Sequence, residues 1–325
     1  MNTNNANTNL GVINFIKSIY QISNDVSIYA DLQLRNIDYK TTGSTSNIDQ
    51  LVVDKKYSFF NPKAGLNYDI NQKNKIYFSL SKAHREPTRS DFENNINIQP
   101  EELIDYELGW KYNAEKFFFN SNLYYMGYKN QLVLTGALDD VGSPIRENSG
   151  KSYRTGIELE SVYKATNKLN ISANISLSEN KNIDYKTNYN GVITDWGDTD
   201  ISFSPNVISS AGIQFSASQD LTFTLLNKFV GNQYMSNTES NISKLSSYST
   251  TDLNILYTIK NSAYFSEIIV TAMINNIFDK EYVSNGYYYT YDDTWSDPNL
   301  ITTIEGTGYY PQAKRNFLLG LTFKL

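Results

Sequence analysis

Acidic residues gather in a polar stretch in the second half of this 325-residue chain, at a spacing that could hold a cation. The stretch contains Asp184, Asp195, Asp198 and Asp200. Carboxylate oxygens are ligands that Ca²⁺ prefers, which makes the cluster a candidate calcium site. Acidic clusters of this kind are more often solvated loops, however, and we assign no metal site to this one.

A second stretch combines acidic with aromatic residues. Asp292, Asp293 and Trp295 follow the tyrosine-rich residues 287–291. An acidic, aromatic loop suits a cationic or sugar-like group, so this stretch is a candidate ligand contact. A solvated loop with an aromatic anchor at a membrane interface explains the same residues. We favour that second interpretation, and the ligand-binding residues therefore stay unassigned.

The chain lacks residue combinations that enzymes commonly use. His84 is the only histidine, so no multi-histidine metal site or histidine pair can form. There is no cysteine, which excludes disulfides and thiolate metal sites. Neither a glycine-rich phosphate loop nor a nucleophile elbow is present. We therefore predict a protein that is not an enzyme and has no cofactor, with His84 as an ordinary side chain near a strand end.

Between the polar stretches, apolar and polar residues alternate. Near the C-terminus, the alternating apolar residues are Phe317, Leu319, Leu321, Phe323 and Leu325, and only Leu318 interrupts the polar set. Residues 26–35, 169–178 and 253–260 repeat the pattern. Because successive strand side chains point to opposite faces, each segment would build one oily and one largely polar face. A helix would space its apolar residues three and four apart.

The connections fall into two length classes that alternate along the chain. Short turns lie at residues 23–24, 71–74, 113–115, 165–167, 218–220 and 260–262. Long polar stretches lie at residues 41–55, 85–102, 136–150, 179–200, 235–245 and 278–310. Short turns on one rim and long loops on the other are typical of transmembrane β-barrels. The sequence therefore predicts an all-β fold, an antiparallel transmembrane β-barrel.

Composition agrees with this fold and excludes others. No run of about 18 apolar residues is available for a transmembrane helix, whereas barrel strands hide their hydrophobicity in alternation. The 26 tyrosines suit the aromatic girdles at membrane interfaces. A net charge of −6 argues against nucleic acid as a partner. A tyrosine-rich soluble β protein, such as a secreted adhesin, is the alternative that composition leaves open.

The number of strands has a topological consequence. We count about 13 strand-like segments, at residues 10–22, 25–39, 52–70, 74–85, 103–113, 116–134, 151–166, 167–178, 201–216, 220–233, 245–259, 263–275 and 312–325. The last strand ends at the rim with the short turns, so the first begins at the rim with the long loops. Bacterial single-chain barrels normally have an even strand number. We therefore expect a polar segment without signal-peptide features, residues 1–9, followed by a partial outer-membrane β-barrel domain, residues 10–325.

Several short motifs follow one another from residue 59 onward: FNPKAGLNY at 60–68, YFSLSKA at 77–83, REPTRSDF at 85–92, YELG at 106–109, NSG at 148–150, GIELE at 156–160, INNIFDKEY at 274–282 and the closing strand at 311–325. In this order they resemble the barrel of TonB-dependent outer-membrane receptors, especially versions from Bacteroidetes-type bacteria. Pro87 is expected to end a strand. Gly109, Gly156 and Gly320 lie within strands, where glycine commonly marks a bend or a close backbone approach.

The resemblance implies the C-terminal part of a barrel of about 22 strands, with about nine strands and an N-terminal plug domain missing from this sequence. It implies four partners: outer-membrane lipid, those missing parts, the TonB complex acting through the plug, and a small solute. The implied function is active uptake of a scarce solute across the outer membrane of a Gram-negative cell. We favour an iron–siderophore or another metal chelate. A passive porin or structural barrel is the alternative, because about 12 or 14 strands could close alone.

Overall fold

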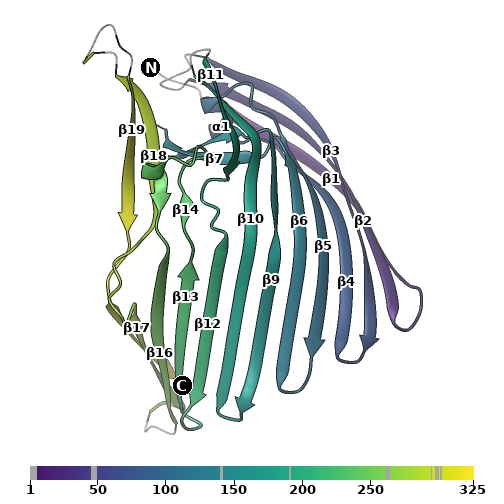
Figure 1. Ribbon diagram of the computed structural model, residues 1–325. Helices are drawn as coiled ribbons and strands as arrows, with labels where there is room; N and C mark the ends of the chain where they lie inside the picture. Colours follow the sequence, from purple (N-terminus) through teal and green to yellow (C-terminus); the bar gives the residue numbers. More distant parts are fainter. Residues whose placement is uncertain are drawn as a thin grey trace.

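The computed structural model describes residues 6–44, 50–139, 142–189, 192–260, 264–293, 295–296, 300 and 302–325. One large antiparallel sheet dominates it, curved like part of a barrel wall (Figure 1). Its strands follow one path without a crossover: β1 (Ala6–Gln21), β2 (Val26–Gly43), β3 (Leu51–Asn71), β4 (Asn74–Arg85), β5 (Glu101–Asn113), β6 (Phe117–Lys129), β9 (Lys151–Thr166), β10 (Leu169–Tyr189), β12 (Val207–Ser216), β13 (Leu221–Val230), β16 (Tyr248–Lys260), β17 (Glu267–Asn275) and β20 (Asn316–Lys324). We call this sheet the wall.

The wall confirms the predicted all-β fold. Its path contains 13 strands, and each corresponds to one of the segments inferred from the alternation. Among the described residues, no helix is long and apolar enough to cross a membrane. The first strand starts at Ala6, inside the segment expected to precede the barrel, and residues 1–5 lie outside the described residues.

Strand register sorts the wall's side chains into two faces. Phe78 on β4 lies opposite Leu108 on β5, and both are exposed. The next pair along, Ser79 and Glu107, points the other way and is joined by a hydrogen bond of 3.0 Å from the serine hydroxyl. The apolar face is the one suited to lipid. The polar face is partly covered by the chain's long connections, and we call it the inner face.

The two ends of the wall lie at opposite rims. The pairing of β1 with β2 runs from Ala6 at the long-loop rim to Gln21 beside the short turn. The strand β20 ends at the short-turn rim, where Figure 1 places the C-terminus. In the described residues, β1 and β20 each have a strand neighbour on one side only. The wall therefore does not close on itself.

Several long connections are more ordered than the sequence predicts. Residues 116–134 were expected to form one strand, but the wall strand β6 ends at Lys129 and β7 (Leu132–Leu138) leaves the wall. Asn130 makes the bend with a φ of 54°, a conformation that asparagine tolerates. The predicted strand at 201–216 begins only at Val207. Here Ile201 is buried beneath the loops and is not part of the wall.

A small core fixes the segment after Pro87 to the inner face. Strand β4 ends at Arg85, as the proline predicts, and a short helix α1 (Arg89–Asn94) follows. The Asp91 carboxylate accepts a 2.7 Å hydrogen bond from the Thr88 amide and caps the helix. Apolar side chains from β2, β3, this segment and β7 are buried together: Ile37, Tyr39, Leu51, Val53, Phe59, Phe92, Ile98 and Leu132.

Two of the three strand glycines mark close approaches, as predicted. A Cβ at Gly109 would lie 2.1 Å from the Tyr77 ring, and one at Gly156 would lie 2.4 Å from the Leu177 carbonyl oxygen. Neither space admits a side chain. Gly320 differs, because the nearest atoms to a Cβ there belong to Thr271 at an ordinary 3.9 Å. Gly320 therefore makes no close approach, and a bend is the part of the prediction that stays untested there.

Candidate functional site

Three hairpins extend from the long-loop rim and meet above the inner face. They consist of β7 with β8 (Pro144–Asn148), the upper half of β10 with β11 (Val192–Asp200), and β18 (Val283–Asp293) with β19 (Thr302–Pro311). Gly136 on β7 lies against the connection that contains Met235 and against β18: its φ is +92°, and a Cβ there would lie 2.5 Å from the Met235 carbonyl oxygen and 3.2 Å from the Tyr288 Cβ. Met235, Leu245 and Tyr288 are buried together at this junction.

The predicted acidic cluster lies on the second hairpin, where three of its four side chains have protein partners. Asp195 binds Lys186 at 2.9 Å and Asp200 binds Lys181 at 2.7 Å. Asp198 accepts a 3.1 Å hydrogen bond from the backbone amide of Asp184. No group of three or more potential metal ligands occurs in the part of the chain that the structure describes.

The second predicted stretch divides between two faces of the β18–β19 hairpin. Asp292 lies on the face that meets the other hairpins and accepts a 2.8 Å hydrogen bond from the Thr303 hydroxyl. Asp293 accepts hydrogen bonds from the backbone amides of Trp295 and Ser296, at 3.1 Å and 3.0 Å, and shapes the hairpin tip.

A cavity of about 630 Å³ lies between the three hairpins. Its lining combines carboxyl, aromatic and hydroxyl groups: Thr135, Ala137, Glu147, Tyr185, Thr187, Thr194, Trp196, Ser236, Asn237, Thr238, Tyr288, Tyr289, Thr290, Asp292, Thr303 and Glu305. No lysine or arginine belongs to this lining among the described residues. A few polar groups converging between aromatic walls are typical of a small-molecule site. We call it the loop cavity.

The carboxyl group of Glu147 connects the first two hairpins. It accepts a hydrogen bond from the hydroxyl of Tyr185, a side chain that is almost fully buried. Burial raises the pKa of Glu147, an effect that the tyrosine hydrogen bond partly offsets. Burial and the neighbouring carboxylate raise the pKa of Tyr185. Tyr185 therefore stays a hydrogen-bond donor at any physiological pH.

A second tyrosine–carboxylate pair lies on the third hairpin. The Tyr288 hydroxyl donates a 2.5 Å hydrogen bond to Glu305. Burial, reinforced by this hydrogen bond, raises the pKa of Tyr288 to about 12. In both pairs one oxygen of the carboxyl group is engaged by a tyrosine. The loop cavity thus presents hydrogen-bond acceptors and negative charge beside aromatic rings, which suits a ligand with cationic or donor groups.

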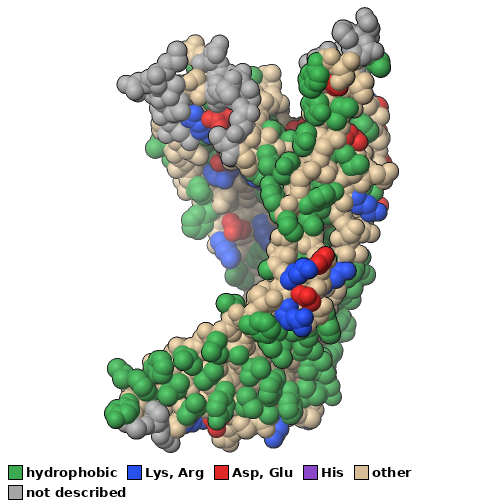
Figure 2. Space-filling model, turned by 90° about the vertical axis from the view of Figure 1, so that its left-hand side faces the viewer, with side chains coloured by type: hydrophobic (Ala, Val, Ile, Leu, Met, Phe, Trp, Pro, Cys, Tyr) green, Lys and Arg blue, Asp and Glu red, His purple; other side chains and the backbone are tan. Residues whose placement is uncertain are grey.

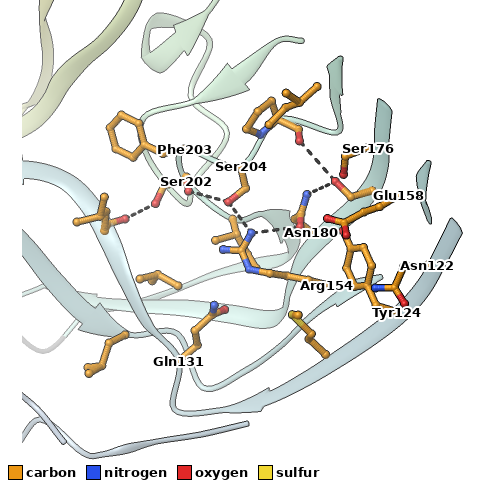
Figure 3. A pocket seen from close by; sticks show the side chains of 18 of the residues that line it. Asn122, Tyr124, Gln131, Arg154, Glu158, Ser176, Asn180, Ser202, Phe203 and Ser204 are labelled. Atoms are coloured by element: carbon orange, nitrogen blue, oxygen red, sulfur yellow. Dashed lines mark hydrogen bonds between the residues drawn. The ribbon is translucent and has the colours of Figure 1, made fainter. Parts of the chain in front are cut away.

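A second cavity of about 480 Å³ lies below, against the inner face (Figure 3). Arg154 extends into it from β9 and donates hydrogen bonds to the Ser204 hydroxyl at 2.9 Å and to Asn180 Oδ1 at 3.2 Å. Glu107 and Glu158 also line it. Its lining includes residues of the wall strands β5, β6, β9 and β10, so we expect it to contact whatever fills the barrel interior.

His84 lies at the penultimate position of β4, near the long-loop rim, where the sequence places it. Its ring stacks on Phe59 with 4.9 Å between the centroids. Nδ1 lies 2.8 Å from Asn61 Oδ1, and Nε2 lies 3.3 Å from a carboxylate oxygen of Glu102. Every polar ring atom thus has a partner within the wall.

Sequence reasoning missed Glu147, Tyr185 and Arg154. Glu147 and Tyr185 are 38 residues apart, in different long stretches, so no local spacing connects them. The one sequence signal for Tyr185 was the alternation of apolar and polar residues, which continues beyond Ser178, where the strand was predicted to end.

This wall, with its two-sided alternation and its inward-folded hairpins, has the architecture of part of a transmembrane β-barrel. The sequence matches the family described as TonB dependent receptor-like, beta-barrel, over residues 1–277. The chain therefore belongs to the TonB-dependent receptor β-barrel family. A comparison with curated proteins gives no match.

Solved structures with the same fold include several metal-uptake proteins. The siderophore receptor PiuA from Acinetobacter baumannii is 17% identical, with a TM-score of 0.73 over 96% of this chain and 43% of that one. The unliganded ferric citrate transporter FecA is 16% identical, with a TM-score of 0.71 over 98% and 45%. The copper transporter OprC is 16% identical, with a TM-score of 0.70 over 97% and 48%. This chain thus spans less than half the length of each, and at these identities the likeness shows the fold alone.

Proposed function

We propose that the chain forms part of the wall and outer loops of a receptor for active solute uptake in the outer membrane of a Gram-negative cell. The observation that carries the proposal is the loop cavity, which lies at the long-loop rim where a solute would first arrive. The proposal assigns no catalytic residue and no cofactor to the chain. Its partners are outer-membrane lipid, further wall strands, a plug domain and, through that plug, the TonB complex.

The open edges of the wall support a composite barrel. Within the described residues, β1 and β20 lack a second strand neighbour, and unpaired backbone groups are costly in lipid. Further strands would satisfy both edges. A passive pore made of this chain alone is disfavoured. It would require β1 and β20 to pair with each other, although both strands run from the long-loop rim to the short-turn rim and all other wall pairs are antiparallel.

A metal chelate is the solute we propose, and the cavity lining constrains its charge. Glu147, Asp292 and Glu305 contribute carboxyl groups, and no basic side chain of the described lining balances them. Like charges placed together at an interface cost several kcal/mol, so an anionic chelate is disfavoured. A neutral or cationic chelate with an apolar body would place that body against Tyr288 and Trp196.

Uptake of radiolabelled iron by the native host tests this proposal. Three probes are compared: a ferric hydroxamate with a free ammonium group, a neutral ferric hydroxamate and ferric citrate. We expect uptake of a hydroxamate complex to be lost when either the chain or TonB is deleted. Trp196→Ala should weaken that uptake, whereas Glu281→Gln, an exposed site outside the cavity, should not. Uptake that persists without TonB would indicate a passive pore.

A further inference from the structure

The outward face of the β18–β19 hairpin carries a row of aromatic side chains. Tyr287, Tyr289 and Tyr291 alternate along β18, and Trp295 continues the row at the tip. Neighbouring tyrosine rings are 6.2 Å and 6.4 Å apart and nearly parallel, and Tyr291 lies 5.8 Å from Trp295. We call these four residues the aromatic row. Figure 2 shows hydrophobic side chains along this hairpin.

Glycines on the neighbouring strand allow the rings to lie flat. Tyr287 pairs with Gly308 and Tyr289 pairs with Gly306. A Cβ at either glycine would be 2.2 Å to 2.4 Å from the tyrosine ring that lies over it. The rings therefore rest on bare backbone and leave their outer sides open. An exposed aromatic surface of this kind marks an interaction site.

The rings of the aromatic row lie on the face of the hairpin opposite Tyr288, Thr290 and Asp292, although Tyr289 is also among the residues that line the edge of the loop cavity. Tyr288 and Tyr309 lie on the opposite face of the hairpin, where Tyr288 contacts Glu305 and the Tyr309 hydroxyl donates a 3.3 Å hydrogen bond to the Ile242 carbonyl. That face packs over the inner side of the molecule. The solute proposed above therefore lies on the other side of the sheet from Tyr287, Tyr291 and Trp295, none of which belongs to the cavity lining.

Below the aromatic row, the same outward side continues into the lipid-facing wall. Exposed Phe317 and Leu319 on β20 belong to the apolar face. Between the apolar face and the row lie charged residues from the two connecting segments: Asp279, Lys280, Glu281, Lys314 and Arg315. Lys314 pairs with Glu281, and Arg315 lies 3.9 Å from Asp279. Figure 2 shows charged side chains gathered at this junction.

The order apolar, charged, aromatic matches the layers of an outer leaflet, from hydrocarbon through phosphorylated headgroup to sugar. Tyrosine and tryptophan favour such interfaces because each combines an apolar ring with a polar atom. We propose that the aromatic row and the charged belt below it bind the saccharide headgroup of the outer-leaflet glycolipid. The flat rings stack against the sugar rings, and Lys280, Lys314 and Arg315 face the phosphate level. The interface is continuous with the lipid-facing wall and does not depend on the proposed solute.

Binding of purified lipopolysaccharide tests the inference, with the full chain held in phosphatidylcholine nanodiscs. The double variant Tyr289→Ala/Tyr291→Ala removes two rings that are 42% and 40% exposed. The matched control, Trp110→Ala/Tyr163→Ala, removes aromatic residues of 41% and 46% exposure at the short-turn rim. We expect affinity to fall about tenfold or more in the first variant, the size of lost aromatic stacking, and to stay unchanged in the control.

Trp295→Ala gives a second measure, because Trp295 is 69% exposed and its loss should leave the fold intact. It should also weaken lipopolysaccharide binding. Equal affinity of wild type and all three row substitutions would overturn the proposal. Equal binding of the deacylated saccharide would overturn it in favour of a soluble glycan. Self-association that the double variant abolishes, without any effect on lipopolysaccharide, would overturn it in favour of a second copy of the chain.

Discussion

The hydrogen bond between Tyr185 and Glu147 should control how tightly the β7–β8 and β10–β11 hairpins are held together. The Tyr185→Phe substitution keeps the ring and removes only the hydroxyl that donates to the carboxyl group. A hydrogen bond contributes about 0.5–1.5 kcal/mol between neutral groups and about 1.5–3 kcal/mol when one group is charged. Because Glu147 is only half-buried and its pKa is raised, we take about 1.5 kcal/mol, the value at which the two ranges meet.

A loss of about 1.5 kcal/mol raises the population of the open hairpins roughly tenfold. Amide hydrogen exchange in residues 180–189 and in β8 should accelerate by that factor, while exchange in the wall strands stays unchanged. The double variant Tyr185→Phe/Glu147→Leu should recover much of the protection, because replacing both polar partners by apolar groups leaves neither unsatisfied.

Two results would refute this account. Unchanged exchange in Tyr185→Phe would mean that the hydroxyl contributes nothing to hairpin packing. Equal acceleration throughout the wall would mean that the substitution perturbs the whole fold and that the pair has no local role.

Three further outcomes are expected. The pKa of Glu147 is raised above its ordinary 4.5, so the contribution of this carboxyl group to loop stability is complete below pH 4.5 and is lost as the pH rises through the raised pKa. Amide exchange in β8 should therefore accelerate as the pH rises through that range, and Glu147→Gln should remove the pH dependence. Gly109→Ala should destabilise the wall by about 1–3 kcal/mol through the clash with Tyr77, seen as earlier loss of heat-modifiable gel migration, whereas Gly320→Ala should not. Leu319→Arg on the apolar face should cost about 2–4 kcal/mol in refolding titrations, and Thr322→Arg on the opposite face much less.

Alternation was sufficient to predict the wall because lipid and barrel interior impose opposite demands on successive residues. Apolar and polar residues therefore alternate along each wall strand, which explains why the predicted number of strands agrees with the structure. The error at residues 116–134 is instructive. Residues 132–134 are apolar and do form a strand, but the φ of Asn130 directs it away from the wall. A single backbone angle therefore sets the direction of β7, and hydrophobic periodicity carries no information about backbone angles.

The loop cavity could not be predicted from the sequence, for a related reason. Its residues come from four long connections, and they meet only because the hairpins fold toward one another. Asp292 was singled out in advance because a local run of acids and tyrosines surrounded it. Glu147 has no such surroundings, and its burial against Tyr185 is a tertiary effect. The approach of Gly136 to Met235, which holds two connections together, is equally invisible in the sequence.

The β18–β19 hairpin, like the wall strands, has two faces that carry different side chains. Tyr288, Thr290 and Asp292 face the loop cavity, while Tyr287 and Tyr291 of the aromatic row face outward. A slip of one residue in pairing would exchange these two sets and move the aromatic row into the cavity. Glycines oppose that slip. Gly306 and Gly308 alone leave room for the tyrosine rings, and a side chain at Gly286 would lie 2.8 Å from the Met235 sulfur and 2.4 Å from the Gly308 carbonyl oxygen. Their positions therefore select one register, and with it the separation of the solute-facing side from the glycolipid-facing side.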